Sequence, residues 1–172
     1  MQTASACCTW ELTHEAKQKG RSIMYADTIT LFNHYKDNSG DIWYPTVIPS
    51  VNINVDKASI IKKYGSESKD RVVLNIRYRF ADSVVMVGDK RYLPPKQWRK
   101  QGVEQLSQTI TFSDGTDFDF FMVGDYGSVD IVVDDDYLDG FYDHMNKEHD
   151  YVFAITSVAK YSAIPHFEIM GA

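Results

Sequence analysis

Apolar and polar side chains alternate in short stretches along most of this chain. The clearest example is 71–80, RVVLNIRYRF, where Val72, Leu74, Ile76, Tyr78 and Phe80 point to one face of an expected strand. Similar alternation, or enrichment in β-branched and aromatic residues, predicts further strands. These are 27–35, 42–55, 83–87, 90–93, 109–113, 118–123, 129–133 and the two halves of 151–172. Short strands separated by turns are typical of a small β-barrel or β-sandwich.

Turn-forming residues indicate how these strands connect. The polar stretch 36–41 predicts a hairpin loop, and Gly88-Asp89 and Asp114-Gly115 predict two more. Ser162 and Pro165 interrupt the last stretch, which predicts a closing hairpin. Pro45 and Pro49 lie inside an expected strand and favour a sheet edge or a bulge there.

Helical patterns are few. The best is Tyr137–Lys147, where Leu138, Phe141, Tyr142 and Met145 share one face behind aspartates suited to a helix N-terminus. A short helix is also expected over 56–64, and a single turn anchored by Trp98 over 95–101. We therefore predict a mainly β fold, a small single-domain β-barrel or sandwich with one or two short helices, over residues 24–172.

The first 23 residues show no strand alternation. Lys19-Gly20-Arg21-Ser22 can be encoded by a purine-rich ribosome-binding sequence just before the codon of Met24. Two interpretations follow: residues 1–23 are a mis-called N-terminal extension, or they are a disordered tail. The only cysteines, Cys7 and Cys8, lie in this segment, so cysteine content says nothing about the redox compartment of the domain.

The composition argues against some functional classes. A formal net charge of −6 argues against general nucleic-acid binding, which needs a positive surface facing phosphates. No apolar run approaches the roughly 18 residues of a membrane span, and residues 1–10 lack the basic start and apolar core of a signal peptide.

Charge is distributed unevenly along the chain. Residues 57–100 contain twelve Lys or Arg and four acids, whereas residues 101–146 contain eleven acids and no Lys or Arg. One interpretation is that the two regions neutralise each other within one fold. The other is a contact in which the basic face of one subunit meets the acidic face of the next, which can close into a ring. The candidate interface residues are Lys62, Lys63, Arg77, Arg79, Asp134, Asp135 and Asp136.

The search for catalytic or metal-binding motifs assigns none. An EF-hand loop ending at Asp139-Gly140 would place Tyr137 and Asn146 at ligand positions, so the calcium pattern fails. His144 and His149 are five residues apart, which is not the i, i+4 spacing of a helical zinc pair. No phosphate-binding loop or nucleophile elbow is present. We therefore expect no enzyme activity, no cofactor and no metal.

Several stretches, taken in order, resemble a known family. They are TITLFNHY, WYPTVIPSVNINV, VLNIRYRF, YLPPKQW, FMVGD and the ending ITSV with IPHFEIMG. Together they resemble the minor capsid or head-closure proteins of tailed phages and prophages, which form the neck or head–tail connector. Phe167 stands where tryptophan is commoner in that family.

The resemblance implies a small β-barrel assembled as a homo-oligomeric ring between the portal or adaptor and the tail, without catalysis. It implies other phage structural proteins as partners, no specific nucleic-acid sequence and no membrane. The protein would be in the host cytoplasm during assembly and then in the virion neck. One alternative is a tail-completion or other minor capsid protein. Another is a small-ligand or carbohydrate-binding β-barrel with Trp43, Tyr44 and Trp98 lining its mouth, and an enzyme comes third.

Overall fold

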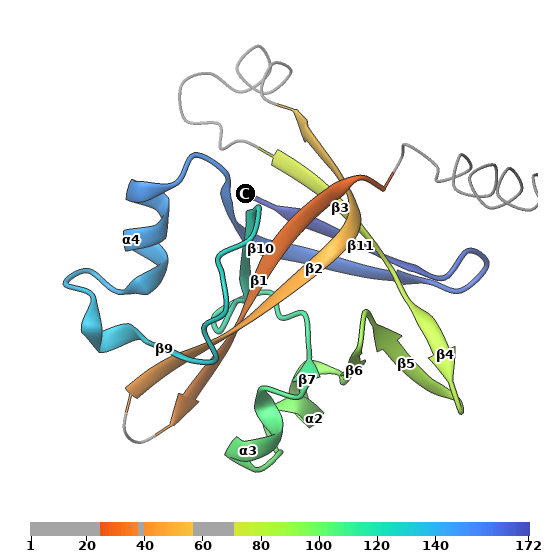
Figure 1. Cartoon of the computed structure of the whole chain (residues 1–172), viewed down its shortest axis with the longest axis horizontal. Helices are drawn as coiled ribbons and strands as arrows, with labels where there is room; N and C mark the ends of the chain where they lie inside the picture. Colours follow the sequence, from red (N-terminus) through yellow and green to blue (C-terminus); the bar gives the residue numbers. More distant parts are fainter. Residues whose placement is uncertain (1–24, 38–39, 57–70) are drawn as a thin grey trace, which may run out of the picture.

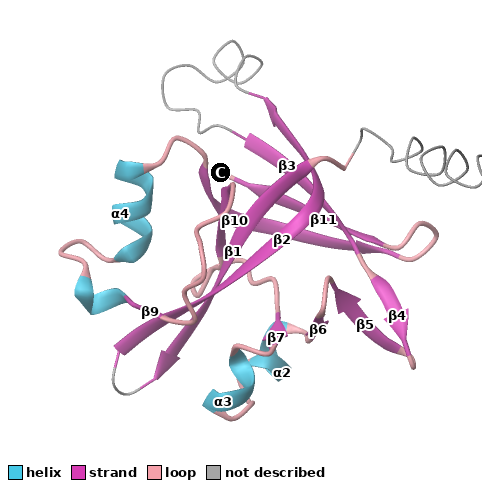
Figure 2. Cartoon of the chain, in the orientation of Figure 1, coloured by secondary structure: helices cyan, strands magenta, loops and turns pink. Residues whose placement is uncertain are grey.

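The computed structural model describes residues 25–37, 40–56 and 71–172. The fold is mainly β and forms a single small domain with three short helices, which confirms the predicted fold class. Figures 1 and 2 show α4 on one side of the strands and α2 and α3 below them. The elements in chain order are β1 (Asp27–Asp37), β2 (Gly40–Asp56), β3 (Arg71–Arg77), β4 (Arg79–Ala81), β5 (Val84–Val87), β6 (Lys90–Tyr92), α2 (Pro95–Trp98), α3 (Val103–Leu106), β7 (Thr109–Ile110), β8 (Phe120–Val123), β9 (Val132–Val133), the 3-10 turn η4 (Asp134–Asp136), α4 (Phe141–Glu148), β10 (Val152–Tyr161) and β11 (His166–Gly171).

Six strands close into an antiparallel barrel. The order of the large sheet is β1-β8-β10-β11-β3-β2-β9, and β1 also pairs with β2. The β1–β2 pairing closes the order β1-β8-β10-β11-β3-β2 into a circuit. Of the strands in this sheet only β9 lies outside the circuit, on the edge of β2. The predicted closing hairpin is confirmed as β10 and β11, which pair with each other and with β8 and β3 respectively.

Alternate residues of the barrel strands fill its interior. Val72, Leu74 and Ile76 of β3 are buried while Arg71 and Arg77 are exposed, as the alternation predicts. They join one large buried cluster with residues of the other five barrel strands, including Leu31, Phe121 and Ile169. The barrel is therefore a packed core.

Strand β2 is long and bends at its prolines. Ser50 has a φ of 58°, and the register with β1 shifts at this point, so that Asp27 pairs with Val51 and Thr28 with Pro49. On its other side β2 pairs with β9 only at Ile42–Trp43 and with β3 only from Asn52 onward, which leaves the stretch containing both prolines without a second described strand. The predicted edge or bulge is confirmed.

The strand predicted over 71–80 is divided in the structure. The strand β3 ends at Arg77, and the Tyr78 N–H donates a hydrogen bond to the carbonyl of Pro165. The chain then leaves the barrel as β4, where Phe80 pairs with Val85 of β5. The prediction that Phe80 faces the core is wrong, because its side chain is 57% exposed.

A second, four-stranded sheet packs beside the barrel in the order β4-β5-β6-β7. Its β5–β6 hairpin turns at Gly88-Asp89, as predicted, and Trp98 of α2 is fully buried, as expected for an anchor.

The hairpin predicted over 109–123 does not form. The strand β7 pairs in parallel with β6, whereas β8 pairs with β1 and β10. Ser113 and Asp119 close the intervening loop through two bonds: the Asp119 N–H donates to the Ser113 carbonyl, and the Ser113 N–H donates to the Asp119 carboxylate. The two short strands therefore join different sheets.

The helix predicted from Tyr137 begins later, at Phe141. Asp134–Asp136 form a 3-10 turn first, and Gly140 has a φ of 86°, which separates that turn from α4. Phe141 and Met145 are buried as predicted, but Leu138 is fully exposed and does not belong to the apolar face. No helix in the described part of the chain has the length and apolarity required to cross a membrane. Asp56, the expected start of a helix over 56–64, is the last residue of β2; the rest of that helix and the segment 1–23 lie outside the described residues.

Candidate interaction surfaces

One exposed stretch of the chain alternates apolar and acidic side chains. It runs from 129 to 139, through β9 and η4, and we call it the acidic–apolar segment. Its exposed residues are Val129, Asp130, Ile131, Val133, Asp135, Asp136, Leu138 and Asp139. Val129, Ile131, Val133 and Leu138 are exposed aliphatic side chains on a segment that also carries four exposed carboxylates, and such apolar groups mark a candidate interaction surface.

Within this segment Asp134 has a structural role. Its Oδ1 accepts hydrogen bonds from the Trp43 indole Nε1 and from the backbone N–H of Phe141, both at 2.8 Å. The second bond satisfies an N–H at the start of α4, so the predicted role of aspartates at this helix N-terminus is confirmed for Asp134. The carboxylate thus connects β2, η4 and α4.

We expect Asp134→Ala to lower the free energy of unfolding by about 2–3 kcal/mol, because two donors lose their acceptor. The matched control is Asp135→Ala, since the neighbouring carboxylate makes no hydrogen bond or ion pair with any described residue. Urea unfolding followed by tryptophan fluorescence measures both variants. Equal stability of the two variants would show that the Trp43 and Phe141 bonds contribute little.

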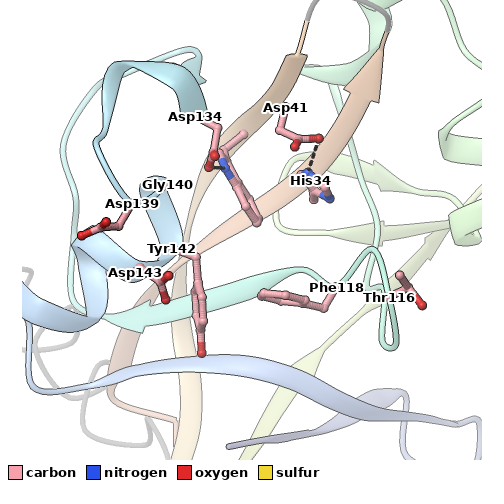
Figure 3. Close-up of a pocket in the computed structure, with 10 residues that line it drawn as sticks. His34, Asp41, Thr116, Phe118, Asp134, Asp139, Gly140, Tyr142 and Asp143 are labelled. Atoms are coloured by element: carbon pink, nitrogen blue, oxygen red, sulfur yellow. Dashed lines mark hydrogen bonds and ion pairs between the residues drawn. The ribbon is translucent and has the colours of Figure 1, made fainter.

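A cavity of about 200 Å³ lies between this segment and the barrel. Its walls combine aromatic side chains, Trp43, Phe118 and Tyr142, with the carboxylates of Asp41, Asp134, Asp139 and Asp143. Figure 3 shows Asp134 on one side of the cavity and Phe118 and Tyr142 on the other. The lining is negatively charged overall and therefore favours cationic groups.

Basic side chains of the same chain already pair with two of these carboxylates. Asp41 accepts from His34 at 3.1 Å and from Lys36 at 3.4 Å, and His34 also stacks on Trp43. The Lys147 ammonium pairs with Asp139. No group of three or more His, Cys, Asp or Glu in the described residues has the arrangement of a metal site. The cavity is consistent with a surface for cationic side chains.

A buried carboxylate lies behind His34. Asp119 is fully buried and accepts three hydrogen bonds, from the backbone N–H groups of His34 and Ser113 and from the Asn33 side-chain amide, at 2.7–3.0 Å. Burial raises the pKa of Asp119 to about 7, and the three N–H donors act against that rise. Asp119 joins β1 to the 111–119 loop and so fixes the wall of the cavity.

A second surface lies around Tyr78, where the chain leaves the barrel. We call it the basic–apolar end, and it consists of the exposed residues Arg77, Arg79, Phe80, Lys160, Tyr161 and Ile164. The Tyr78 hydroxyl donates to the Tyr161 carbonyl at 2.8 Å, and its ring lies 5.4 Å from the ring of Phe80. The Lys160 ammonium is 5.1 Å from the Tyr78 ring centroid. The end of β3, β4 and the β10–β11 turn therefore present one continuous surface.

The two surfaces lie at opposite ends of the molecule. In Figure 1, β9, η4 and α4 are on the left, whereas β4, β5 and the β10–β11 turn are on the right. Of the predicted interface residues, Arg77 and Arg79 lie together on the right, and Asp134, Asp135 and Asp136 form η4 on the left. Lys62 and Lys63 lie outside the described residues.

The aromatic residues expected to line a ligand-binding mouth do not lie together. Trp43 borders the cavity described above, but Tyr44 and Trp98 pack with Leu93 and Leu106 in a separate buried cluster. The prediction that Trp43, Tyr44 and Trp98 together line the mouth of a ligand-binding barrel is therefore wrong.

Sequence reasoning did not identify the exposed apolar residues of either surface. Periodicity places Phe80 and Leu138 on apolar faces of expected elements, and it makes no prediction for Ile164. The exposure of these residues could have been inferred from their neighbours in the sequence. They lie beside Pro165 or within runs of charged residues, where a large apolar side chain has no core close by to pack against.

Comparison with protein families gives one match, to a family of unknown function designated DUF6751, over residues 23–172. Neither the comparison with curated proteins nor that with solved structures gives a match. Because the family match covers most of the chain, this protein belongs to the DUF6751 family.

Proposed function

We propose that this protein is a structural component of tailed-phage or prophage particles, located at the head–tail junction. In this role, copies of the chain assemble into a ring that contacts the portal or adaptor on one side and the tail on the other. This function requires no catalysis. It is supported by the sequence motifs that resemble head-closure proteins and by the mainly β fold that this resemblance implies.

The observation that carries the proposal is the separation of charge between the two ends of the barrel. Exposed Arg77, Arg79 and Lys160 lie at one end, and exposed Asp135 and Asp136 lie at the other. A single molecule cannot bring such ends together, but neighbouring molecules can. A head-to-tail contact between unlike surfaces generates a ring when its rotation closes.

The proposal predicts that this protein is found in assembled particles. Peptide mass spectrometry on purified particles from an induced lysogen of the source strain should detect peptides from the region after Met24. Their copy number relative to the major capsid protein should equal that of a small ring. The most N-terminal peptide also locates the start of the chain in the particle.

A deletion of the gene provides the control. Particles made without the protein should contain heads that fail to join tails or that lose their DNA. Complete particles with full heads and attached tails that lack this protein would rule out the head–tail junction.

A further inference from the structure

We infer that the basic–apolar end of one copy docks on the acidic–apolar segment of the next copy. Phe80, Tyr161 and Ile164 form the apolar centre on one side, and Ile131, Val133 and Leu138 form it on the other. Arg79 and Lys160 pair with Asp135 and Asp136 around that centre. The inference rests on the proposed ring, and it names the surfaces that join its subunits.

The apolar side chains provide the first argument. Ile164 is 71% exposed, and Leu138 is fully exposed. Ile131 and Phe80 have about half of their surface in solvent as well. Isolated exposed aliphatic residues are normal, but here they gather on two small surfaces. Removing such side chains from water is favourable, so mutual coverage offers a driving force for the contact.

The charged side chains provide the second argument. No ion pair in the described part of the chain includes Arg77, Arg79 or Lys160. Arg77 stacks on the Tyr25 ring at 3.7 Å, and Arg79 reaches only the Gly88 carbonyl, at 3.5 Å. The carboxylates of Asp135 and Asp136 likewise have no described partner. Within the described residues these charges have no counterion, and they are complementary across a contact between copies.

Edge strands provide the third argument. The strand β9 pairs only with β2 and ends the large sheet, and β4 pairs only with β5 and ends the small one. An edge strand presents backbone donors and acceptors that another chain can satisfy. Each surface thus contains an apolar centre, a charged rim and a strand edge, which is the usual anatomy of a specific interface.

Two exposed acids near the basic–apolar end do not oppose the contact. Asp82 lies in the β4–β5 turn, and Asp89 follows Gly88, whose carbonyl accepts from Arg79. Arg77, Arg79 and Lys160 outnumber them, so the surface remains positive. At the other surface the Lys147 ammonium is already paired with Asp139, which leaves Asp130, Asp135 and Asp136 as the exposed acids of the segment without an ion pair to a described residue.

Cysteine cross-linking tests the contact directly, because the described part of the chain contains no cysteine. In a background with Cys7→Ser and Cys8→Ser, the double variant Leu138→Cys with Ile164→Cys is treated with a short bis-maleimide. We expect a ladder of covalent oligomers, both in concentrated protein and in particles complemented with the variant. Each single variant should remain monomeric, because the contact joins unlike surfaces.

The matched control is Leu138→Cys with Met170→Cys. Met170 is 44% exposed on the same strand as His166 but lies outside the basic–apolar end. A ladder from this control equal to that of the test pair, dimers from a single variant, or capture of a different phage protein would overturn the inference. Charge reversal by Arg79→Asp should weaken self-association at least tenfold, and added salt should weaken the wild type.

The outcomes for the contact and for the proposed function can be separated. The protein could be present in particles at the copy number of a ring but give no cross-link between positions 138 and 164. That result would overturn the contact and leave the proposed head–tail function unaffected. Cross-linking of the purified protein combined with its absence from particles would support the contact and overturn the function. Absence of both overturns both.

Discussion

Asp119→Ala is expected to lower the free energy of unfolding by about 3–6 kcal/mol, because three N–H donors lose the buried carboxylate that accepts their hydrogen bonds. The donors are the backbone N–H groups of His34 and Ser113 and the amide of Asn33. Stabilities of small domains are about 5–15 kcal/mol, so much of the protein should be unfolded at moderate temperature. The loss should be large because the site lies at the junction of β1 and the 111–119 loop.

Equilibrium urea unfolding monitored by circular dichroism measures this effect. The control is Asp114→Ala, which removes an exposed carboxylate from the same loop and should change the free energy by less than about 0.5 kcal/mol. If Asp119→Ala is no less stable than that control, the three hydrogen bonds do not hold the loop on the barrel.

The same carboxyl gives the stability a defined pH dependence. Burial raises the pKa of Asp119 from 3.8 to about 7, so between these values the folded state keeps a proton that the unfolded state has lost. The contribution of this group to the free energy of unfolding therefore falls as the pH rises from about 4 to about 7 and is constant above that range. Relative to Asp119→Asn, which does not titrate, wild-type stability should decline across this window. Parallel pH profiles for the two proteins would contradict the assignment.

Phe167→Ala is expected to cost about 3–5 kcal/mol, the usual range for removing a buried aromatic side chain. Phe167 is fully buried, and its ring lies 4.6–5.1 Å from the rings of Tyr78, Tyr92 and Phe112. It connects the barrel strand β11 to the side sheet through Tyr92 and to the basic–apolar end through Tyr78. The variant should thus destabilise the barrel and the side sheet together.

Met170→Ala is the matched control for this variant, because Met170 is on the same strand and faces solvent. Its expected cost is below about 1 kcal/mol. Thermal unfolding by calorimetry should show one cooperative transition at a lower temperature for Phe167→Ala. Two separate transitions would show that the side sheet unfolds independently and that Phe167 does not couple the two parts.

Local pattern was sufficient to predict most strands of this fold. Buried Val72, Leu74 and Ile76 alternate with less buried residues because one face of β3 is core and the other is partly in solvent, and that information lies within a few residues. The closing hairpin and the bend near Pro49 were predicted for the same reason. Each depends on residues that are neighbours in the sequence.

Features that depend on distant residues could not be predicted. Whether 109–123 forms a hairpin depends on Asp119, which accepts hydrogen bonds from Asn33 and His34, more than eighty residues earlier in the sequence. The start of α4 depends on Asp134, whose carboxylate also binds Trp43, 91 positions away in the sequence. Without these partners, periodicity alone favours a hairpin and an earlier helix.

The candidate surfaces were predicted in part. Charge counts identified Arg77, Arg79 and the three aspartates, because net charge is a property of the sequence itself. The role of Asp134 in the fold and the exposure of Phe80, Leu138 and Ile164 depend on where strands end and turns form. Only the folded chain places the apolar side chains beside the charged ones.

The closed circuit of strands also has a kinetic consequence. The barrel contains local hairpins, β1–β2 and β10–β11, which can form early, but its closure needs the pairings of β1 with β8 and of β3 with β11. Both join residues that are roughly ninety positions apart, and contacts of such long sequence separation slow folding. Before either has formed, four strand edges are open on each nascent molecule, and two stay open until the second forms. Slow closure at high expression should therefore favour mispairing between molecules, and lower temperature or slower synthesis should raise the yield of correctly closed barrels.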